Sequence, residues 1–199
     1  MDPKVSGVIL AGGESTRLGF DKSLVPFRGA PLIARVVETI RPAVEECIVV
    51  TNYAAKFAGV LGGVRFVRDA VPQRGSLVGI YSGLLAARCD RALVVACDMP
   101  FLNVRLLRHL AALSGECDVV IPRHGDALEP LHALYGRSCI APIARTLQRG
   151  NVTIISFFPE VKVCYVEEPV LNELDPEGLS FVNINTPRDW ERAQALDSK

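Results

Sequence analysis

The 199-residue sequence has no excess of charge of either sign, because 22 lysines and arginines balance 22 aspartates and glutamates. This balance argues against a general binder of nucleic acids or anionic membranes, which usually carries a basic excess. It does not exclude a local basic pocket. Hydrophobic residues make up 49% of the chain, close to the average for a globular protein, so the composition also argues against disorder.

Long apolar runs are absent as well. The first apolar run, residues 8–11, is far too short for a membrane span or for the apolar region of a signal peptide, and residues 1–4 lack the basic start of such a peptide. We therefore expect a cytoplasmic protein with no membrane partner and no nucleic-acid partner. No linker divides the sequence, which favours a single domain over residues 1–199.

Residue types that often carry chemistry are scarce or scattered. No two of the six cysteines form a C-x-x-C pair, and several lie inside apolar runs: Cys47, Cys89, Cys97, Cys117, Cys139 and Cys164. We interpret them as buried small hydrophobic residues rather than as disulfides, with a metal site as the alternative. The three histidines, His109, His124 and His132, lie apart, and we expect none of them to be a catalytic base.

Apolar runs of strand length alternate with helical patterns over the first two thirds of the chain. Strands are expected at residues 5–10, 47–51, 64–67, 92–97 and 118–121, and helices at 31–40, 53–61, 77–88 and 104–113. This alternation predicts an α/β fold with a mostly parallel central sheet and helices on both faces.

The last third is less regular. Strands are expected at 131–135, 162–166 and 181–184, and helices at 138–148 and 187–196, the second with Thr186 as its N-cap. Residues 152–158 are compatible with a strand or a short helix. The acidic residues of 167–168 and 173–177 indicate a solvated loop.

The strongest functional signal is a glycine-rich loop at residues 10–22, with the sequence L-A-G-G-E-S-T-R-L-G-F-D-K, directly after the first strand. Ligands of open α/β sheets bind at the carboxyl ends of strands. Gly12 and Gly13 allow backbone N–H groups to approach phosphate oxygens, while Arg17 offers a planar fork and Lys22 a mobile charge. The alternative is a plain turn with two solvated cations. The loop matches neither a Rossmann fingerprint nor a P-loop, which disfavours a dehydrogenase or a P-loop NTPase.

Two carboxylates follow strands at the same predicted edge of the sheet. Asp98 comes directly after the strand at 92–97, and a carboxylate that faces bound phosphates is a typical ligand of Mg²⁺. Beside the glycine-rich loop we predict this metal role, with capping of the following turn as the alternative. Asp69, just past the strand at 64–67, is a second candidate, whose alternative is a turn before Pro72.

The motif at residues 10–22 occurs together with C-D-M-P at 97–100, E-P-L-H-A-L-Y at 129–135 and N-I-N-T-P at 183–187. In this combination the chain resembles the molybdenum cofactor guanylyltransferases from residue 7 to 196. The resemblance implies a three-layer, Rossmann-like nucleotidyltransferase fold, one nucleotidyltransferase domain over 1–199, and Mg²⁺ as cofactor. GMP would pass from GTP to the phosphate of molybdopterin, with release of pyrophosphate. Transient contacts with cofactor-synthesis or chaperone proteins are also implied.

The resemblance further assigns roles to single residues. The implied nucleotide-binding residues are Leu10, Ala11, Gly12, Gly13, Lys22, Asn52, Asp69 and Asp98, and Asp98 would also bind Mg²⁺. The implied pterin-side residues are Asn183 and Asn185. We expect Arg17, Lys22 and Asp98 to be catalytic, because an anionic acceptor phosphate needs no general base and catalysis then rests on positioning and charge neutralisation.

Two positions depart from the family pattern. Ser76 replaces a common proline in the loop at 74–79, which would border the guanine base, and Glu129 stands where the family often has histidine. The role of that histidine therefore does not carry over, and the pterin contacts are expected to differ.

Two other activities remain open: a cytidylyltransferase acting on molybdopterin, and a nucleotidyltransferase for another phosphorylated acceptor. By family resemblance, the second glycine of the segment Leu10-Ala11-Gly12-Gly13 favours GTP, because the cytidylyl relatives tend to carry Ala-Ala-Gly in this segment. A nucleotide-binding module without catalysis would be expected to lose Arg17, Lys22 or Asp98, and all three are present.

Overall fold

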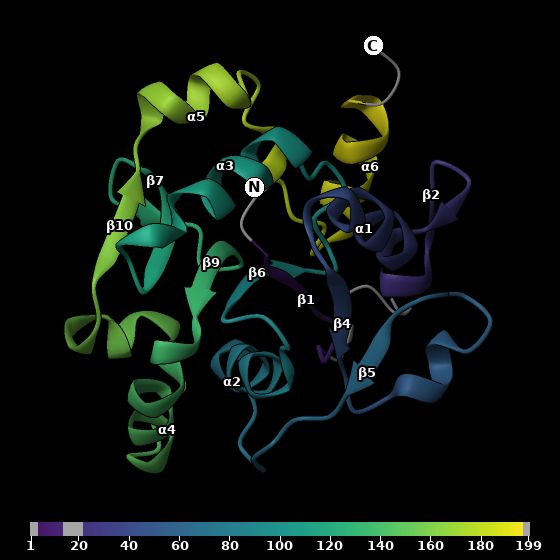
Figure 1. Ribbon diagram of the computed structural model, residues 1–199. Coiled ribbons are helices and arrows are strands. Elements are labelled where there is room, and N and C mark those ends of the chain that lie inside the picture. The colour runs from purple at the N-terminus through teal and green to yellow at the C-terminus, as the bar shows by residue number, and fades with distance from the viewer. Residues whose placement is uncertain (1–3, 14–21, 197–199) are drawn as a thin grey trace.

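The computed structural model describes residues 4–13 and 22–196, and its centre is one eight-stranded sheet (Figure 1). The strand order is β10-β7-β9-β6-β1-β4-β5, with β8 paired to β7 beside this path. The strands are β1 (Ser6–Leu10), β4 (Glu46–Val50), β5 (Arg65–Val67), β6 (Arg91–Ala96), β7 (Val119–His124), β8 (Ala127–Leu128), β9 (His132–Gly136) and β10 (Val163–Val166). A separate hairpin consists of β2 (Pro26–Phe27) and β3 (Ala30–Pro31).

Helices cover both faces of the sheet. They are α1 (Leu32–Ile40), α2 (Ser76–Ala86), α3 (Val104–Ala112), α4 (Ile140–Gln148), α5 (Glu168–Leu174) and α6 (Pro187–Leu196). Helices α1, α3 and α5 contribute to the core on one face, whereas α2 and α4 contribute to the core on the other, as Figure 1 shows. The prediction of a mostly parallel sheet with helices on both faces is confirmed. Within the described residues, no helix has the length and apolar character needed to cross a membrane.

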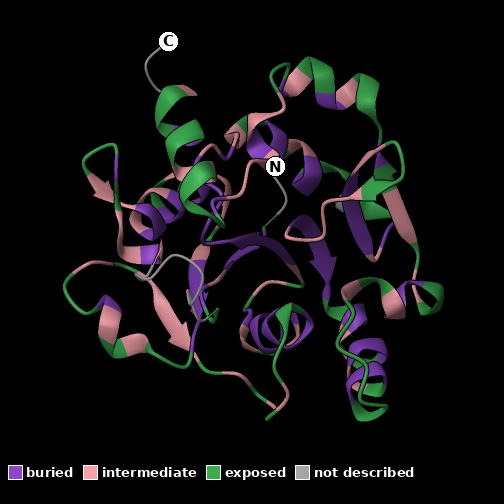
Figure 2. Cartoon of the chain, turned by 180° about the vertical axis from the view of Figure 1, so that it is seen from behind, coloured by how far each residue is buried: buried purple, intermediate pink, exposed green. Residues whose placement is uncertain are grey.

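The central strands are apolar throughout because each of their faces meets a helix layer. In β1, Val8 packs in the core beside α2 and Ile9 in the core beside α1, and Val94 and Val95 of β6 alternate in the same way. Figure 2 shows these strands buried while the outer helix faces are exposed. Gly83 allows α2 to lie close to β1, because a Cβ atom at this position would collide with the side chain of Val8.

Strand direction determines which loops meet. Strand β1 runs parallel to both neighbours, with Leu10 opposite Val50 of β4 and opposite Ala96 of β6. The carboxyl ends of these three strands therefore share one edge of the sheet, together with the end of β5. Strand β9 is inserted antiparallel between β6 and β7, so the segment that precedes β9 reaches the same edge.

Two predicted elements are wrong. Residues 53–61 contain only the 3₁₀ helix η3 (Ala54–Phe57), because Ala58 is extended and Gly59 has a φ of +77°, which ends the helical path. Residues 181–184 do not form a strand. Gly178 turns the chain with a φ of +61° into the 3₁₀ helix η7 (Leu179–Phe181), and a loop follows.

The structure also shows the conformation of two segments that the sequence left irregular or ambiguous. The segment that was compatible with a strand or a helix is the 3₁₀ helix η6 (Ile154–Glu160). Part of the expected acidic loop is instead helix α5, which begins with a proline in its first turn. Leu171 is buried and Leu174 is packed against the core, three residues apart on one face, so this acidic helix still has an apolar side.

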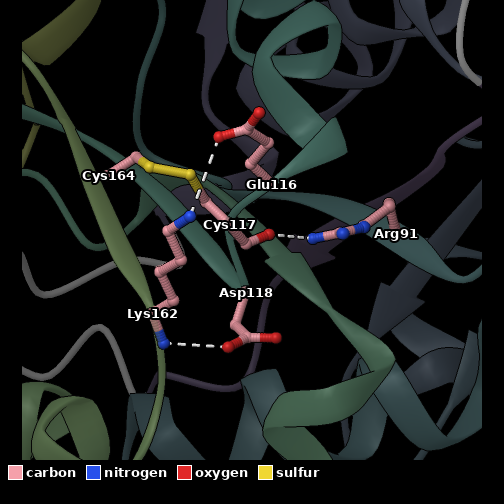
Figure 3. Close-up of a disulfide and its surroundings, with 6 residues drawn as sticks. All are labelled: Arg91, Glu116, Cys117, Asp118, Lys162 and Cys164. Atoms are coloured by element: carbon pink, nitrogen blue, oxygen red, sulfur yellow. Dashed lines mark hydrogen bonds and ion pairs between the residues drawn. A yellow bond between two sulfur atoms is a disulfide. The ribbon is translucent and has the colours of Figure 1, made fainter.

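The expectation that no cysteine forms a disulfide is also wrong, because Cys117 and Cys164 are joined (Figure 3). Strand β10 runs parallel to β7 and brings Cys164 beside the start of β7, where the two Cα atoms lie 5.9 Å apart. Backbone N–H of Lys162 donates to Asp118 Oδ2 (2.8 Å) at the same place. A strand pairing between residues 47 apart in sequence leaves no mark in the local apolar pattern. The other cysteines are buried, apart from the half-buried Cys89.

Candidate functional site

A cavity of about 600 Å³ lies at the carboxyl edge of β1, β4, β5 and β6. Its size falls within the range of small-molecule sites. It is lined by Leu10, Gly12, Gly13, Lys22, Val50, Asn52, Tyr53, Asp69, Arg74, Gly75, Ser76, Gly79, Ala96, Cys97, Asp98, Leu131, Asn183 and Asn185. Of the predicted site residues that the structure describes, all except Ala11 are among them.

A short chain of polar contacts joins three of these residues. Lys22 Nζ donates to Asp98 Oδ2 at 2.5 Å and to Asn185 Oδ1 at 2.8 Å. Lys22 and Asp98 are mostly buried, with side chains 17% and 12% exposed, so their charges interact in an environment with little water. Residues that are more than 160 positions apart in sequence thus meet at one point of the cavity.

The second oxygen of Asp98 differs from the first. Oδ1 is buried and has no hydrogen-bond partner among the described residues. A buried carboxylate oxygen without a partner is uncommon in proteins, and a bound ion or water is one way to satisfy it. Mg²⁺ fits this position, because it prefers oxygen ligands and is typically held by one or two carboxylates together with substrate phosphates. Nowhere in residues 4–13 and 22–196 do three or more His, Cys, Asp or Glu side chains gather as a metal site.

The loop that carries Asn185 is fixed to Asp98 and to helix α6. Backbone N–H of Ile184 donates to the carbonyl oxygen of Asp98 (2.9 Å). Asp189 Oδ2 accepts from the backbone N–H groups of Asn185 (3.0 Å) and Thr186 (2.8 Å), and these bonds hold the pKa of Asp189 below its usual range. Asp189 N–H in turn donates to Thr186 Oγ1 (3.2 Å), which confirms Thr186 as the N-cap of α6.

A second polar pair lies farther along the same edge, after β4 and β5. Asn52 Nδ2 donates to Asp69 Oδ2 (2.7 Å), and backbone N–H of Asp69 donates back to Asn52 Oδ1 (3.1 Å). Asn52 is exposed and Asp69 is half-buried, and both line the cavity. The remaining carboxylate oxygen, Asp69 Oδ1, has no hydrogen-bond partner within the described part of the chain, so it is available to accept from a ligand.

The structure does not place every predicted residue in the cavity. Ala11 is buried beneath it, and its backbone N–H donates to Val50 O (2.9 Å). Arg17 lies outside the described residues. Glu129 is half-buried, and burial raises its pKa, but only the nearby Leu131 lines the cavity. Burial lowers the pKa of His132 to about 4, so this histidine is neutral near pH 7.

Sequence reasoning missed several lining residues, and Tyr53 is the clearest case. It directly follows Asn52 at the end of β4, but the helical pattern after it led to its assignment within a helix. Its place just past a parallel strand was the signal that could have identified it.

Comparisons with known proteins identify one family. Residues 7–163 match the family model of the MobA-like NTP transferase domain. A probable molybdenum cofactor guanylyltransferase from Pelotomaculum thermopropionicum is 37% identical over 193 residues, 97% of this chain and 93% of that protein. A molybdenum cofactor guanylyltransferase from Desulfosudis oleivorans is 35% identical over 96% of this chain and 95% of its own length.

Solved structures are similar to this chain as well. Molybdopterin-guanine dinucleotide biosynthesis protein A from Archaeoglobus fulgidus superposes with a TM-score of 0.85 at 31% identity, covering 98% of this chain and 99% of that chain. A nucleotidyl transferase from Methanothermobacter superposes with a TM-score of 0.77 at 24% identity over 98% of this chain and 99% of its own, which supports the fold alone.

Proposed function

The chain belongs to the MobA-like NTP transferase family, and we propose that it is a molybdenum cofactor guanylyltransferase. It transfers GMP from GTP to the phosphate of molybdopterin, which forms the guanine dinucleotide cofactor and releases pyrophosphate. The observation that carries the proposal is the contact of Lys22 with Asp98 and Asn185 at the centre of the cavity, beside the open oxygen of Asp98.

We propose that the two ends of the cavity receive different substrates. The nucleotide lies along residues 10–13, the pair of Asn52 and Asp69, and Lys22. Molybdopterin lies toward Asn183 and Asn185, on the side of Asp98 that the loop before α6 covers. This arrangement is supported by the strand order, in which the groups after β1, β4 and β5 all lie on one side of Asp98, and by the hydrogen bond from Ile184 N–H to Asp98 O, which keeps the loop with Asn183 and Asn185 next to Asp98.

Nucleotidyltransferases generally work with a divalent metal ion, and we propose that Asp98 holds Mg²⁺ here. The Oδ1 atom of Asp98, which has no hydrogen-bond partner among the described residues, supports this role. When bound, the ion neutralises charge on the nucleotide phosphates. Lys22 is already fixed by Asp98 and Asn185, so its ammonium group is positioned for the phosphates before they arrive.

The reaction is a displacement at phosphorus. An oxygen of the molybdopterin phosphate forms a bond to the α-phosphorus of GTP, while the bond from that phosphorus to the bridging oxygen breaks and pyrophosphate leaves with the electron pair. The acceptor is already anionic, so no side chain has to remove a proton. We propose that Lys22 and Arg17 offset the negative charge that grows on pyrophosphate, and that the asparagines orient the acceptor.

We also propose that residues 1–199 form one nucleotidyltransferase domain. One sheet takes strands from both halves of the chain, and Trp190 of α6 packs against Phe27 of the small hairpin at 5.7 Å between ring centroids. The cytoplasmic location, the absence of a nucleic-acid partner and transient contacts with cofactor-synthesis or chaperone proteins remain predictions of the sequence.

A nucleotide panel tests the proposed activity. The protein is incubated with Mg²⁺, molybdopterin and GTP, CTP or ATP, and pyrophosphate release is followed. We expect release with GTP, and loss of release when EDTA removes the divalent cation. Turnover with CTP but not GTP would overturn the nucleotide assignment. Turnover with a sugar phosphate but not with molybdopterin would overturn the acceptor.

A further inference from the structure

Tyr53 has a large side chain that lines the cavity and is still 48% exposed. Val50, the last residue of β4, also lines the cavity but is buried. An aromatic ring of this kind leaves apolar area in contact with water, and a flat ligand ring can cover that area.

Local contacts determine where the ring lies. Backbone N–H of Tyr53 donates to Thr51 Oγ1 (3.1 Å), which fixes the residue directly after the strand. Lys56 Nζ lies 5.7 Å from the centroid of the Tyr53 ring, and Lys56 is outside the set of residues that line the cavity. The ring is therefore supported by η3 and is accessible from the cavity.

The position of Tyr53 along the sheet edge identifies the substrate it faces. The order β6-β1-β4 puts β4 two strands from Asp98, a distance of about 10 Å at the usual strand spacing. The loop with Asn183 and Asn185 is bonded to Asp98 itself. If the α-phosphate lies near Asp98, the space toward β4 is sufficient for a ribose and a base, whereas the acceptor lies on the other side.

We propose that Tyr53 binds the guanine ring of GTP by stacking, and so contributes to nucleotide affinity without touching the reacting atoms. This inference rests on the proposed function. Stacking needs only the flat face of the ring, so it is insensitive to the phenolic hydroxyl and to the phosphates. Asn52, the residue before Tyr53, and its partner Asp69 line the same cavity and offer polar groups to the edge of the nucleoside.

The test compares Kd values for two ligands, GTP and inorganic tripolyphosphate, which carries the phosphates without a base. Both are measured by calorimetry with Mg²⁺ in the absence of molybdopterin. For Tyr53→Ala we expect GTP binding to weaken by roughly tenfold or more, and tripolyphosphate binding to stay unchanged. Tyr53→Phe should bind GTP like the wild type. Tyr165→Ala removes another exposed tyrosine, on β10 and outside the cavity, and should have no effect.

The contrary outcomes are distinct. Equal weakening of GTP and tripolyphosphate by Tyr53→Ala would overturn stacking, and so would a loss in Tyr53→Phe as large as that in Tyr53→Ala. A raised KM for molybdopterin with unchanged GTP binding would mean that the ring stacks on the pterin, and would also overturn the inference. A wild-type protein that turns over CTP but does not bind GTP would overturn the proposed function itself.

Discussion

Two carboxylates lie on opposite edges of the sheet, and we assign a structural role to one and propose ligand binding for the other. Asp98 at the carboxyl edge and Glu46 at the amino edge have side chains that are 12% and 13% exposed, and each is paired with a cation. Their burial and charge are thus nearly equal. They differ in how many of their oxygen atoms have partners.

Glu46 is fully satisfied by its surroundings. Oε1 accepts from Ser6 Oγ (2.9 Å) and from backbone N–H of Arg88 (2.7 Å), and Oε2 accepts from Arg65 (2.8 Å). These bonds connect the starts of β1, β4 and β5 to the end of α2. Asp98 has Lys22 on one oxygen and no described partner on the other. An incomplete bonding pattern, rather than burial or charge, distinguishes Asp98, the carboxylate for which we propose a functional role.

The largest effect that tests this difference is expected at Asp98. Asp98→Asn keeps the shape of the side chain and removes its charge, so we expect pyrophosphate release to fall at least about a hundredfold, since one preorganised electrostatic group is lost. The free energy of unfolding should fall by less than for Glu46→Gln, because Lys22 keeps its bond to Asn185 and one oxygen of Asp98 has no partner to lose. Near-normal pyrophosphate release by the folded variant would refute the metal assignment.

Glu46 should give the opposite result. Glu46→Gln removes one charge of a mostly buried, hydrogen-bonded pair, so we expect the free energy of unfolding to fall by about 2 kcal/mol, less than for a fully buried pair because Arg65 is 38% exposed. Chemical denaturation measures this loss. Turnover well below the unfolding temperature should remain within about twofold of the wild type. Glu38→Gln, on the exposed face of α1, serves as the control and should change neither quantity.

The smallest expected effect is the change with pH in the stability that Glu46 contributes. Burial alone would raise the pKa of Glu46, but hydrogen bonds from Arg65, backbone N–H of Arg88 and Ser6 bring it below its usual 4.5. The stability that the ionised Glu46 contributes is therefore complete above about pH 4.5 and is lost as the pH falls through the lower folded pKa. The difference in unfolding free energy between wild type and Glu46→Gln should narrow in acid. A difference that widened below pH 4.5 would contradict this assignment.

Much of the carboxyl edge was predictable from the sequence, because local signals coincide there. The apolar run that ends at Leu10, the glycines after it and Asp98 after β6 each follow from a strand and the turn that ends it. Parallel pairing then brings the strand ends together without any further information. The catalytic and binding roles of these residues remain predictions.

What could not be predicted depends on contacts between distant segments. The reversed direction of β9 and the bond between Cys117 and Cys164 are set by strand neighbours that a local pattern does not reveal. Helix α5 was hidden because its apolar residues are few and lie among acidic ones. Tyr53 was obscured for another reason: the helical period after it is real, but Gly59 ends the turn early.

The hydrogen bond from Ile184 to Asp98 has a consequence for the order of events during synthesis. A nascent chain contains the glycine-rich loop and Asp98 when half of its length has been made, yet Asn185 and the loop that holds it emerge only near the end. Until then, Lys22 lacks its hydrogen bond to Asn185, and Asp98 lacks the hydrogen bond from Ile184. The proposed substrate-binding centre is therefore one of the last parts of the molecule to be completed during synthesis. All strands of the sheet that supports it have been made by then.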